Sequence, residues 1–172
     1  PGDDDDKPSV EYSYELGPKF SRIIAKARTT QNADVFEENY SCVDGRGRLY
    51  QSRNKTAEGR YIVSGFTIFN SRGAEIEVFH PYESDSDVCD EDPPAGVLSI
   101  RTTYDSTYRV LESSEPGVDL YGERLISRTV YEPLKKLDYD AEDLNANGEH
   151  TDTPVITYID GLGRTTSIER VL

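Results

Sequence analysis

IDGLGRTT at 159–166 is the clearest copy of a pattern that also occurs as VDGRGR (43–48), FNSRGAE (69–75), TYDSTYRV (103–110) and VYEPLKKL (130–137). Each stretch combines turn-forming residues with flanking residues that suit β-strands. The turn centres recur about 26 to 35 residues apart, a spacing typical of a repeated supersecondary unit. The repeat predicts an all-β chain of successive antiparallel hairpins. The repeat favours a structural protein that forms a surface, rather than an enzyme.

The turns place aspartate, asparagine and glycine where a hairpin needs them. Asp-Gly between strand-like segments is a strong hairpin signal, because glycine readily adopts the positive φ that such turns require. Aspartate and arginine four positions apart can pair across the turn, while the aspartate also accepts backbone N–H groups. We expect these residues to fix the turns and stack one repeat on the next, rather than bind a substrate. The predicted turn residues are Asp44, Gly45, Gly47, Arg48, Asn70, Gly73, Asp105, Arg109, Asp160, Gly161, Gly163 and Arg164.

Alternating polar and apolar residues predict strands along the whole chain. The expected strands cover 9–16, 19–28, 34–43, 48–53, 61–69, 74–80, 97–104, 109–113, 124–131, 134–139, 155–159 and 164–171. Segment 20–28 is the best helical candidate, but it alternates equally well as a strand. The charged stretch 83–96 has no periodicity and is expected to be a surface loop, as is the polar stretch 140–154.

Composition agrees with a sheet that has one solvated face. Only 35% of the residues are hydrophobic and the mean hydropathy is -0.68, yet there are 12 tyrosines. Tyrosine suits a pleated, half-buried surface. The net charge of -14 opposes binding to nucleic acid or to an anionic membrane. No apolar run reaches the ~20 residues that span a bilayer, so no membrane insertion is expected.

The amino-terminal residues 1–8 are expected to be a flexible acidic segment. PGDDDDK at 1–7 matches an enterokinase recognition sequence, and a native acidic linker is equally compatible with it. Residues 9–172 are predicted to form a single β-rich domain. Since the chain starts without methionine and ends in a strand-like segment, we expect it to be a piece of a larger chain.

Cys42 and Cys89 are the only cysteines of the chain. Two cysteines do not establish a disulfide, although they can pair in an oxidising compartment. Cys42 lies among alternating strand residues, whereas Cys89 lies in the acidic loop. This placement favours a buried free thiol at Cys42.

Residues 143–152 (DLNANGEHTD) carry the candidate metal site, and calcium is the only cofactor that the sequence suggests. Their spacing follows the D-x-N-x-N-G pattern of calcium loops, in which glycine permits a sharp turn. The candidate ligands are Asp143, Asn145, Asn147, Glu149 and Asp152. Pro154, however, stands where such a loop has its bidentate glutamate. The alternative is an asparagine-glycine loop that binds no metal.

Other residue patterns give no catalytic candidate. His80 and His150 have no cysteine or histidine at zinc-ligand spacing. Ser64-Gly65 lacks the G-x-S-x-G context of a hydrolase. The glycines of the turns precede no predicted helix that would bind phosphate. The sequence therefore predicts no catalytic residues and no enzyme.

The turns also resemble those of the RHS/YD-repeat superfamily, in which Tyr/Ile-Asp-x-x-Gly-Arg recurs; IDGLGR at 159–164 is nearly the consensus. GRYIVSGFTIFNSRGAEIEVFHPYES at 59–84 is similar to a segment of insecticidal toxin complex B-type proteins. GVLSIRTTYDSTYRVLESSEPG (96–117) and VYEPLKKLDYDAED (130–143) follow in the family's order. The chain departs from the family at Tyr108, which replaces the turn glycine, and at Leu134, where tryptophan is frequent. Nothing matches the family's self-cleaving protease site.

The resemblance implies a non-enzymatic segment of a hollow β-shell that encapsulates a toxic carboxy-terminal polypeptide and helps deliver it. Its implied partners are the rest of a larger chain, the enclosed toxin and other toxin-complex subunits. A secreted or extracellular bacterial location is expected. The alternative is an autonomous extracellular β-rich adhesion or recognition module, stabilised by calcium.

Overall fold

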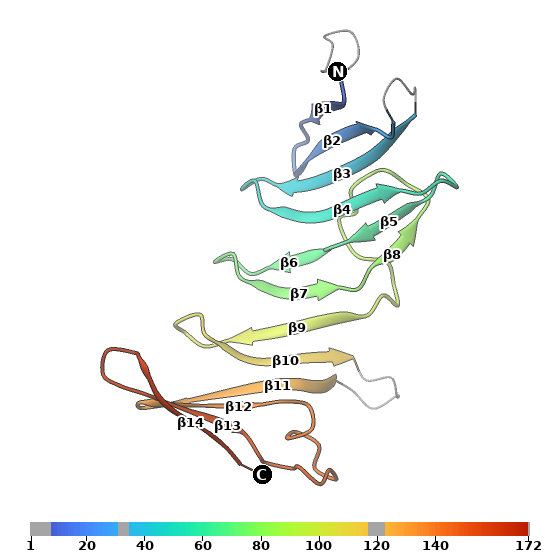
Figure 1. The fold of residues 1–172 in the computed structure, drawn as a ribbon. Coiled ribbons are helices and arrows are strands. Elements are labelled where there is room, and N and C mark those ends of the chain that lie inside the picture. Colours follow the sequence, from blue (N-terminus) through green and yellow to red (C-terminus); the bar gives the residue numbers. More distant parts are fainter. Residues whose placement is uncertain (1–7, 31–34, 117–122, 172) are drawn as a thin grey trace. The chain divides into compact units, whose positions relative to one another are not determined.

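The computed structural model describes residues 8–30, 35–116 and 123–171 (Figure 1). Within these residues the chain forms fourteen strands and no helix, which confirms the all-β prediction. The strand pairs with a defined register are all antiparallel. The same residues accordingly include no helix long and apolar enough to cross a membrane. Except for Pro8, the acidic segment predicted at 1–8 lies outside the described residues.

The strands form two sheets. The six-stranded sheet has the order β1-β2-β3-β4-β5-β8, and its strands are β1 (Val10–Glu15), β2 (Phe20–Arg28), β3 (Phe36–Asp44), β4 (Leu49–Lys55), β5 (Tyr61–Ser64) and β8 (Tyr82–Ser84). The eight-stranded sheet has the order β14-β13-β12-β11-β10-β9-β7-β6. Its strands are β6 (Thr67–Phe69), β7 (Glu75–Phe79), β9 (Ser99–Tyr104), β10 (Val110–Pro116), β11 (Glu123–Glu132), β12 (Lys135–Tyr139), β13 (Val155–Ile159) and β14 (Thr165–Arg170).

The chain also divides into two compact units. One contains the residues up to Ile68 together with Val78–Val97, and the other contains Phe69–Glu77 together with the residues from Leu98 onward. That residues 9–172 form a single domain stays a prediction.

The apolar segment 61–69 is two strands rather than the single strand expected from sequence. β5 ends at Ser64 and pairs with β4 and β8, whereas β6 begins at Thr67 in the eight-stranded sheet. Gly65 lies between them with φ of 66°, in the left-handed region that glycine adopts without steric strain. The predicted loop 83–96 was also too long at its start, because Tyr82–Ser84 forms β8.

One face of the six-stranded sheet carries the apolar core. Ile24, Tyr40, Arg53 and Val63 are successive cross-strand partners on β2, β3, β4 and β5, so their side chains share a face. Ile24, Tyr40 and Val63 are at most 8% exposed. Tyr40 also meets Tyr61 edge to face, with ring centroids 5.6 Å apart. We call this surface the core face of the sheet.

The opposite face of this sheet is open and mostly uncharged at its centre. Ser41, Ser52 and Ser64 are successive cross-strand partners there, and all three are half-buried. The hydroxyls of Ser52 and Ser64 lie 3.2 Å apart. At the sheet edge, Tyr12 and Tyr14 of β1 are 64% and 67% exposed. The packed core of this sheet therefore lies on one side only.

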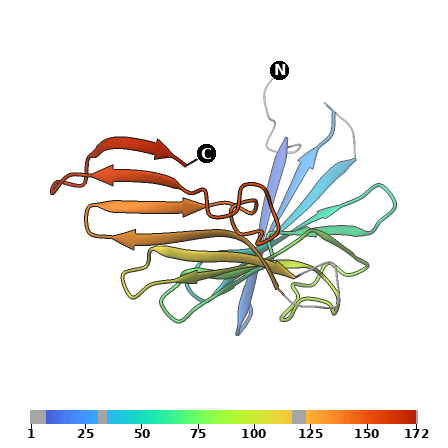
Figure 2. The same cartoon turned by 90° about the horizontal axis from the view of Figure 1, so that it is seen from below.

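The hydrophobic side chains of the eight-stranded sheet are less buried than those of the six-stranded sheet. Val130, Leu137 and Ile156 are cross-strand partners on β11, β12 and β13, and each is only half-buried. Figure 2 shows these strands as neighbouring orange and red ribbons. No hydrophobic side chain of the described part of β9 to β14 belongs to the buried core. This sheet therefore keeps an apolar row in partial contact with solvent.

Glu38 on β3 provides a test of electrostatic stabilisation in the six-stranded sheet. Lys55 Nζ donates to its carboxylate at 2.8 Å and the Tyr40 hydroxyl donates at 2.9 Å. Chiefly through Lys55, these donors lower the pKa of Glu38 from 4.5 to about 2. The unfolded state then binds the proton more tightly, so the stabilisation is complete above pH 4.5 and is lost as the pH falls towards 2.

We therefore expect the melting temperature of the wild type to fall more steeply between pH 4.5 and 2 than that of Glu38→Gln. Circular dichroism melts at half-unit pH steps measure both curves. Parallel curves across this window would show that ionised Glu38 does not stabilise the fold.

Candidate functional site

The hairpin turn between β3 and β4 is organised by the side chain of Asp44. Its Oδ1 accepts the backbone N–H groups of Arg46 at 2.8 Å and Arg48 at 3.0 Å. Its Oδ2 accepts the Arg48 Nε–H at 2.8 Å, which adds an ion pair. Two backbone hydrogen bonds close the turn, from Asp44 N–H to the Arg48 carbonyl and from Gly47 N–H to the Asp44 carbonyl. One carboxylate thus satisfies both the backbone and the arginine of the turn.

The same arrangement recurs at three further turns, in which Asn70, Asp105 and Asp160 take the position of Asp44. Asp105 and Asp160 each accept two turn N–H groups through Oδ1, and accept the Nε–H of the arginine four positions later, Arg109 or Arg164, through Oδ2. Asn70 makes the two backbone contacts without an arginine. The backbone N–H groups and then the arginine lower the pKa of Asp105 and of Asp160. We call these four the Asx turns.

The fourth residue of each Asx turn has a positive φ. Gly47, Gly73 and Gly163 have φ values of 76°, 97° and 79°. Tyr108 occupies this position in the turn that begins at Asp105, with φ of 71°. In the sequence, Tyr108 stands out as a departure from the family's turn glycine. The structure shows the same hydrogen bonds as in the other turns, with tyrosine in a conformation that non-glycine residues rarely adopt.

The predicted turn glycines Gly45 and Gly161 occupy the second position of their turns and do not have positive φ. A methyl group at either position would meet no atom within 4 Å. These two glycines are therefore not required by the backbone. The fifth stretch of the sequence repeat, VYEPLKKL, also differs: Leu134 takes φ of 59° in a two-residue turn between Glu132 and Lys135.

A β-bulge follows three of the Asx turns at the same distance. After Asp44 the register passes from Val43↔Leu49 to Cys42↔Gln51, which leaves Tyr50 without a partner. Leu111 and Thr166 are skipped in the same way, six residues after Asp105 and Asp160. A bulge bends its strand and increases the local twist. The repeated unit is therefore a turn followed by a bulge, and the bulge was not predicted from the sequence.

Neighbouring turns of the eight-stranded sheet also touch each other. The Tyr108 hydroxyl donates to Asn70 Oδ1 at 3.0 Å, and the Arg72 guanidinium lies over the Tyr108 ring at 5.4 Å. The Arg109 guanidinium lies 4.1 Å over the ring of Tyr131 on β11. These contacts place arginine against aromatic faces, an attractive arrangement. They connect one hairpin to the next.

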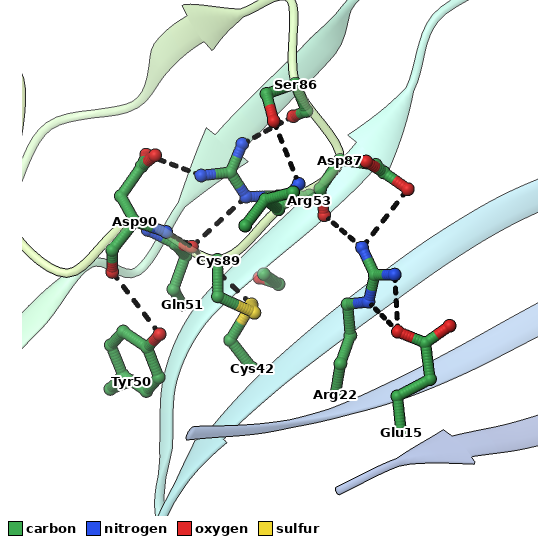
Figure 3. Close-up of a disulfide and its surroundings, with 12 residues drawn as sticks. Glu15, Arg22, Cys42, Tyr50, Gln51, Arg53, Ser86, Asp87, Cys89 and Asp90 are labelled. Carbon is green, nitrogen blue, oxygen red and sulfur yellow. Dashed lines mark hydrogen bonds and ion pairs between the residues drawn. A yellow bond between two sulfur atoms is a disulfide. The ribbon is translucent and has the colours of Figure 1, made fainter. Parts of the chain in front are cut away.

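Cys42 and Cys89 form a disulfide with Cα atoms 6.0 Å apart, so the expectation of a buried free thiol at Cys42 was wrong (Figure 3). Cys42 is fully buried on the core face. No sequence pattern places Cys89 near Cys42, because the acidic loop that carries Cys89 has no periodicity. In the structure, residues 85–92 of this loop lie against the core face, and this brings the two sulfur atoms together.

A buried polar network surrounds the disulfide. The side chains of Gln51 and Arg53 on β4 are fully buried. Arg53 Nη2 lies 2.5 Å from Asp90 Oδ2, and Arg53 Nη1 donates to the Ser86 carbonyl at 2.6 Å. Gln51 Oε1 accepts the Asp90 N–H at 3.0 Å. The Tyr82 hydroxyl donates to Asp90 Oδ2 at 2.6 Å, and burial followed by this carboxylate raises the pKa of Tyr82.

This network was not predicted from the sequence, although two of its residues carry a visible signal. Gln51 and Arg53 alternate with outward-facing residues on the predicted strand 48–53. This strand follows the predicted strand 34–43, which contains the buried Cys42. An inward-facing arginine needs a carboxylate partner, but several acidic residues of the loop were equally available. Which of these carboxylates pairs with Arg53 depends on the path of the loop across the sheet, and in the structure it is Asp90.

The candidate calcium ligands lie in the loop between β12 and β13, where protein donors already occupy several of their oxygens. Asp143 Oδ2 accepts the Asp140 N–H at 2.8 Å, and Asp143 Oδ1 accepts the Thr153 hydroxyl at 2.7 Å. Asn145 Oδ1 accepts the Asn147 N–H at 3.2 Å. Asp152 has φ of 60° and its N–H donates to the Asp143 carbonyl. Calcium binding by Asp143, Asn145, Asn147, Glu149 and Asp152 stays a prediction.

The fold is similar to part of solved Tc toxin structures. In the crystal structure of TcdB2-TccC3, 9% of that chain matches 95% of this one with a TM-score of 0.71 and 17% identity. In a Photorhabdus luminescens Tc holotoxin pore, 8% of that chain matches 89% of this one, with a TM-score of 0.64 and 16% identity. TcdB2-TccC3 without its hypervariable C-terminal region gives a TM-score of 0.65 over 86% of this chain, at 17% identity.

These comparisons confirm the resemblance at the level of the fold. The chain spans 8% to 9% of the length of the chains that it matches. No family model and no curated protein sequence matches it. The shared feature is therefore an arrangement of β-hairpins in a small part of much larger proteins.

The two glycines of the β3–β4 turn give a matched test of the turn geometry. Gly47→Ala should lower the free energy of unfolding by about 1 kcal/mol, because an L-residue is strained at φ of 76°. Gly45→Ala should change it by less than about 0.5 kcal/mol, since its new methyl group enters open space. Urea unfolding measures both. Equal effects of the two substitutions would contradict this account of the turn.

The buried position of Arg53 can be tested against an exposed arginine of the same sheet. Arg53→Ala should lower the free energy of unfolding by about 3 kcal/mol, because it leaves Asp90 without its buried partner. The control is Arg60→Ala, which removes exposed ion pairs with Glu83 and Asp85 and should cost much less, because exposed ion pairs are weak. Chemical denaturation compares them. A loss at Arg53 no larger than that at Arg60 would overturn the structural role of the network.

Proposed function

We propose that the chain is a non-enzymatic wall segment of an RHS-repeat, toxin-complex B-like shell. In this role the shell encapsulates a toxic carboxy-terminal polypeptide and helps deliver it. The partners of the segment are the rest of its own larger chain, the enclosed polypeptide and other toxin-complex subunits. The observation that carries the proposal is the likeness in fold of almost the whole chain to a small part of TcdB2-TccC3.

The packing of the eight-stranded sheet supports a role as part of a larger wall. Its apolar row of Val130, Leu137 and Ile156 stays half-buried. Such residues normally become covered by another layer, by a neighbouring chain or by a bound partner. A segment that continues into more wall, or faces an enclosed polypeptide, provides that cover.

The edge strands support the same role. Every residue of β1, at one edge of the six-stranded sheet, is exposed, as is every residue of β14, at one edge of the eight-stranded sheet. An edge strand presents unpaired N–H and C=O groups to a further strand. In the proposed wall, each edge pairs with the next strand of the larger chain.

The disulfide supports a secreted, extracellular location for the segment. Disulfides persist in oxidising compartments and are rare in the cytosol. The Cys42–Cys89 pair is therefore consistent with a protein that works outside the cell. The charged side chains of the Asx turns are engaged in turn formation, which supports a structural rather than a catalytic use of these residues.

Encapsulation can be tested on the complete product of the gene that encodes this segment, purified under non-reducing conditions. We expect electron microscopy to show a closed hollow particle. A carboxy-terminal polypeptide inside it should resist a protease until the shell is denatured. A particle without a lumen, with all parts equally accessible to the protease, would exclude the proposed function.

The edge strands allow a second test, on the 172-residue protein itself. A wall segment with two open edges should self-associate, and Tyr12→Lys with Tyr14→Lys should shift it towards monomer by placing charges on β1. Leu162→Lys is the control, because it adds a charge at a turn residue that is 78% exposed. Sedimentation velocity measures the distribution. A wild type that is monomeric at about 100 μM and melts cooperatively would favour an autonomous adhesion or recognition module instead.

A further inference from the structure

The acidic loop 85–92 is held against the core face at several points (Figure 3). Arg22 on β2 donates to the Asp87 carbonyl at 2.7 Å and lies 3.1 Å from the Asp87 carboxylate. The Tyr50 hydroxyl donates to the Asp90 carbonyl at 3.3 Å. These contacts reach strands of the sheet from β2 to β4. The loop therefore acts as a cover over side chains that would otherwise meet water.

Two restraints on the loop 85–92 are stronger than the others, and they involve the adjacent residues Cys89 and Asp90. One is the covalent bond between Cys42 and Cys89. The other is the ion pair of Asp90 with Arg53, whose side chain is fully buried. Releasing Asp90 would leave a buried guanidinium without its countercharge, which is strongly unfavourable. The remaining ion pairs of the loop are more exposed, as in Lys19–Glu91, where both side chains are about 60% exposed, and exposed pairs are weak.

We propose that the disulfide and the Arg53–Asp90 ion pair form a redox-sensitive latch, and that reduction by a thiol allows the loop to open locally. The backbone pairing of β2 to β5 involves neither restraint, so these strands stay paired when the loop opens. Opening exposes the buried side chains of Gln51 and Arg53, which the loop contacts, to solvent. This inference does not require that the segment enclose a polypeptide.

The chemistry needs an external dithiol or two molecules of a monothiol. A thiolate attacks the half-buried Cys89 sulfur, because the Cys42 side chain is fully buried, and Cys42 leaves as a thiolate. A second thiol then breaks the mixed disulfide at Cys89. The cystine gains two electrons and two protons, and the reductant becomes a disulfide. After this step only the noncovalent restraints hold the loop.

The ion pair determines how far reduction alone opens the loop. With the disulfide broken, Asp90 still contacts Arg53 and Tyr82 and still donates its N–H to Gln51. Reduction should therefore increase the population of open loop without emptying the closed state. Loss of both restraints should open the loop further than loss of either one.

Hydrogen exchange followed by mass spectrometry tests the latch in the 172-residue protein with dithiothreitol as the reductant. Exchange of peptides covering 85–92 should accelerate at least about tenfold on reduction, because exchange follows the open population. In the oxidised Asp90→Asn variant, exchange of these peptides should accelerate by a similar factor. In the reduced Asp90→Asn variant, it should accelerate by more than in the reduced wild type or in the oxidised variant. Peptides covering β13 and β14 serve as the internal reference and should keep their exchange rates.

The matched control is the double variant Cys42→Ser with Cys89→Ser, whose loop should exchange as fast as that of the reduced wild type and should not respond to dithiothreitol. Thiol titration verifies two free thiols per reduced chain. Three results would each overturn the proposal. They are a disulfide that dithiothreitol does not reduce without denaturant, loop exchange within twofold of the oxidised protein after full reduction, and acceleration spread equally over β13 and β14.

Discussion

Four hairpins of the described residues depend on one interaction: a side-chain oxygen at the first turn position accepts two backbone N–H groups of the same turn. Asp44, Asn70, Asp105 and Asp160 all make it. The interaction is strong enough for Tyr108 to be held at positive φ, where glycine stands in the other three turns. Where aspartate is present, its second oxygen also fixes an arginine, which in the case of Arg109 lies over an aromatic ring of the next hairpin. Local turn formation and contact between hairpins are thereby coupled.

The acidic loop 85–92 has a different role: it covers the core face of the six-stranded sheet, which has few large aliphatic residues. Gln51 and Arg53 occupy central positions of the core face where valine or leucine would be usual. Their polar atoms need partners, and the loop provides a backbone carbonyl, an N–H group and a carboxylate. The covalent bond to Cys42 keeps these partners in place. A charged surface segment thus becomes part of the interior of the six-stranded sheet.

The local features of the fold could be predicted from sequence, because they depend on residues close together in the chain. Asp160, Gly163 and Arg164 define their turn within five positions, and the alternation of β13 continues directly from it. The disulfide depends on the path of a loop between residues 47 positions apart, which no local pattern encodes. The break at Gly65 was hidden in a continuous apolar run. The bulge at Tyr50 was hidden because a register shift depends on both strands of a pair.

The constant distance between each aspartate turn and its bulge has an evolutionary consequence. Inserting or deleting one residue between Asp160 and Thr166 would reverse which side of β14 each following side chain occupies. Duplicating or removing an entire hairpin with its turn and bulge would preserve that orientation. Proteins built on this unit should therefore differ in length by whole hairpins, and small insertions should accumulate in long connections such as the one between β12 and β13.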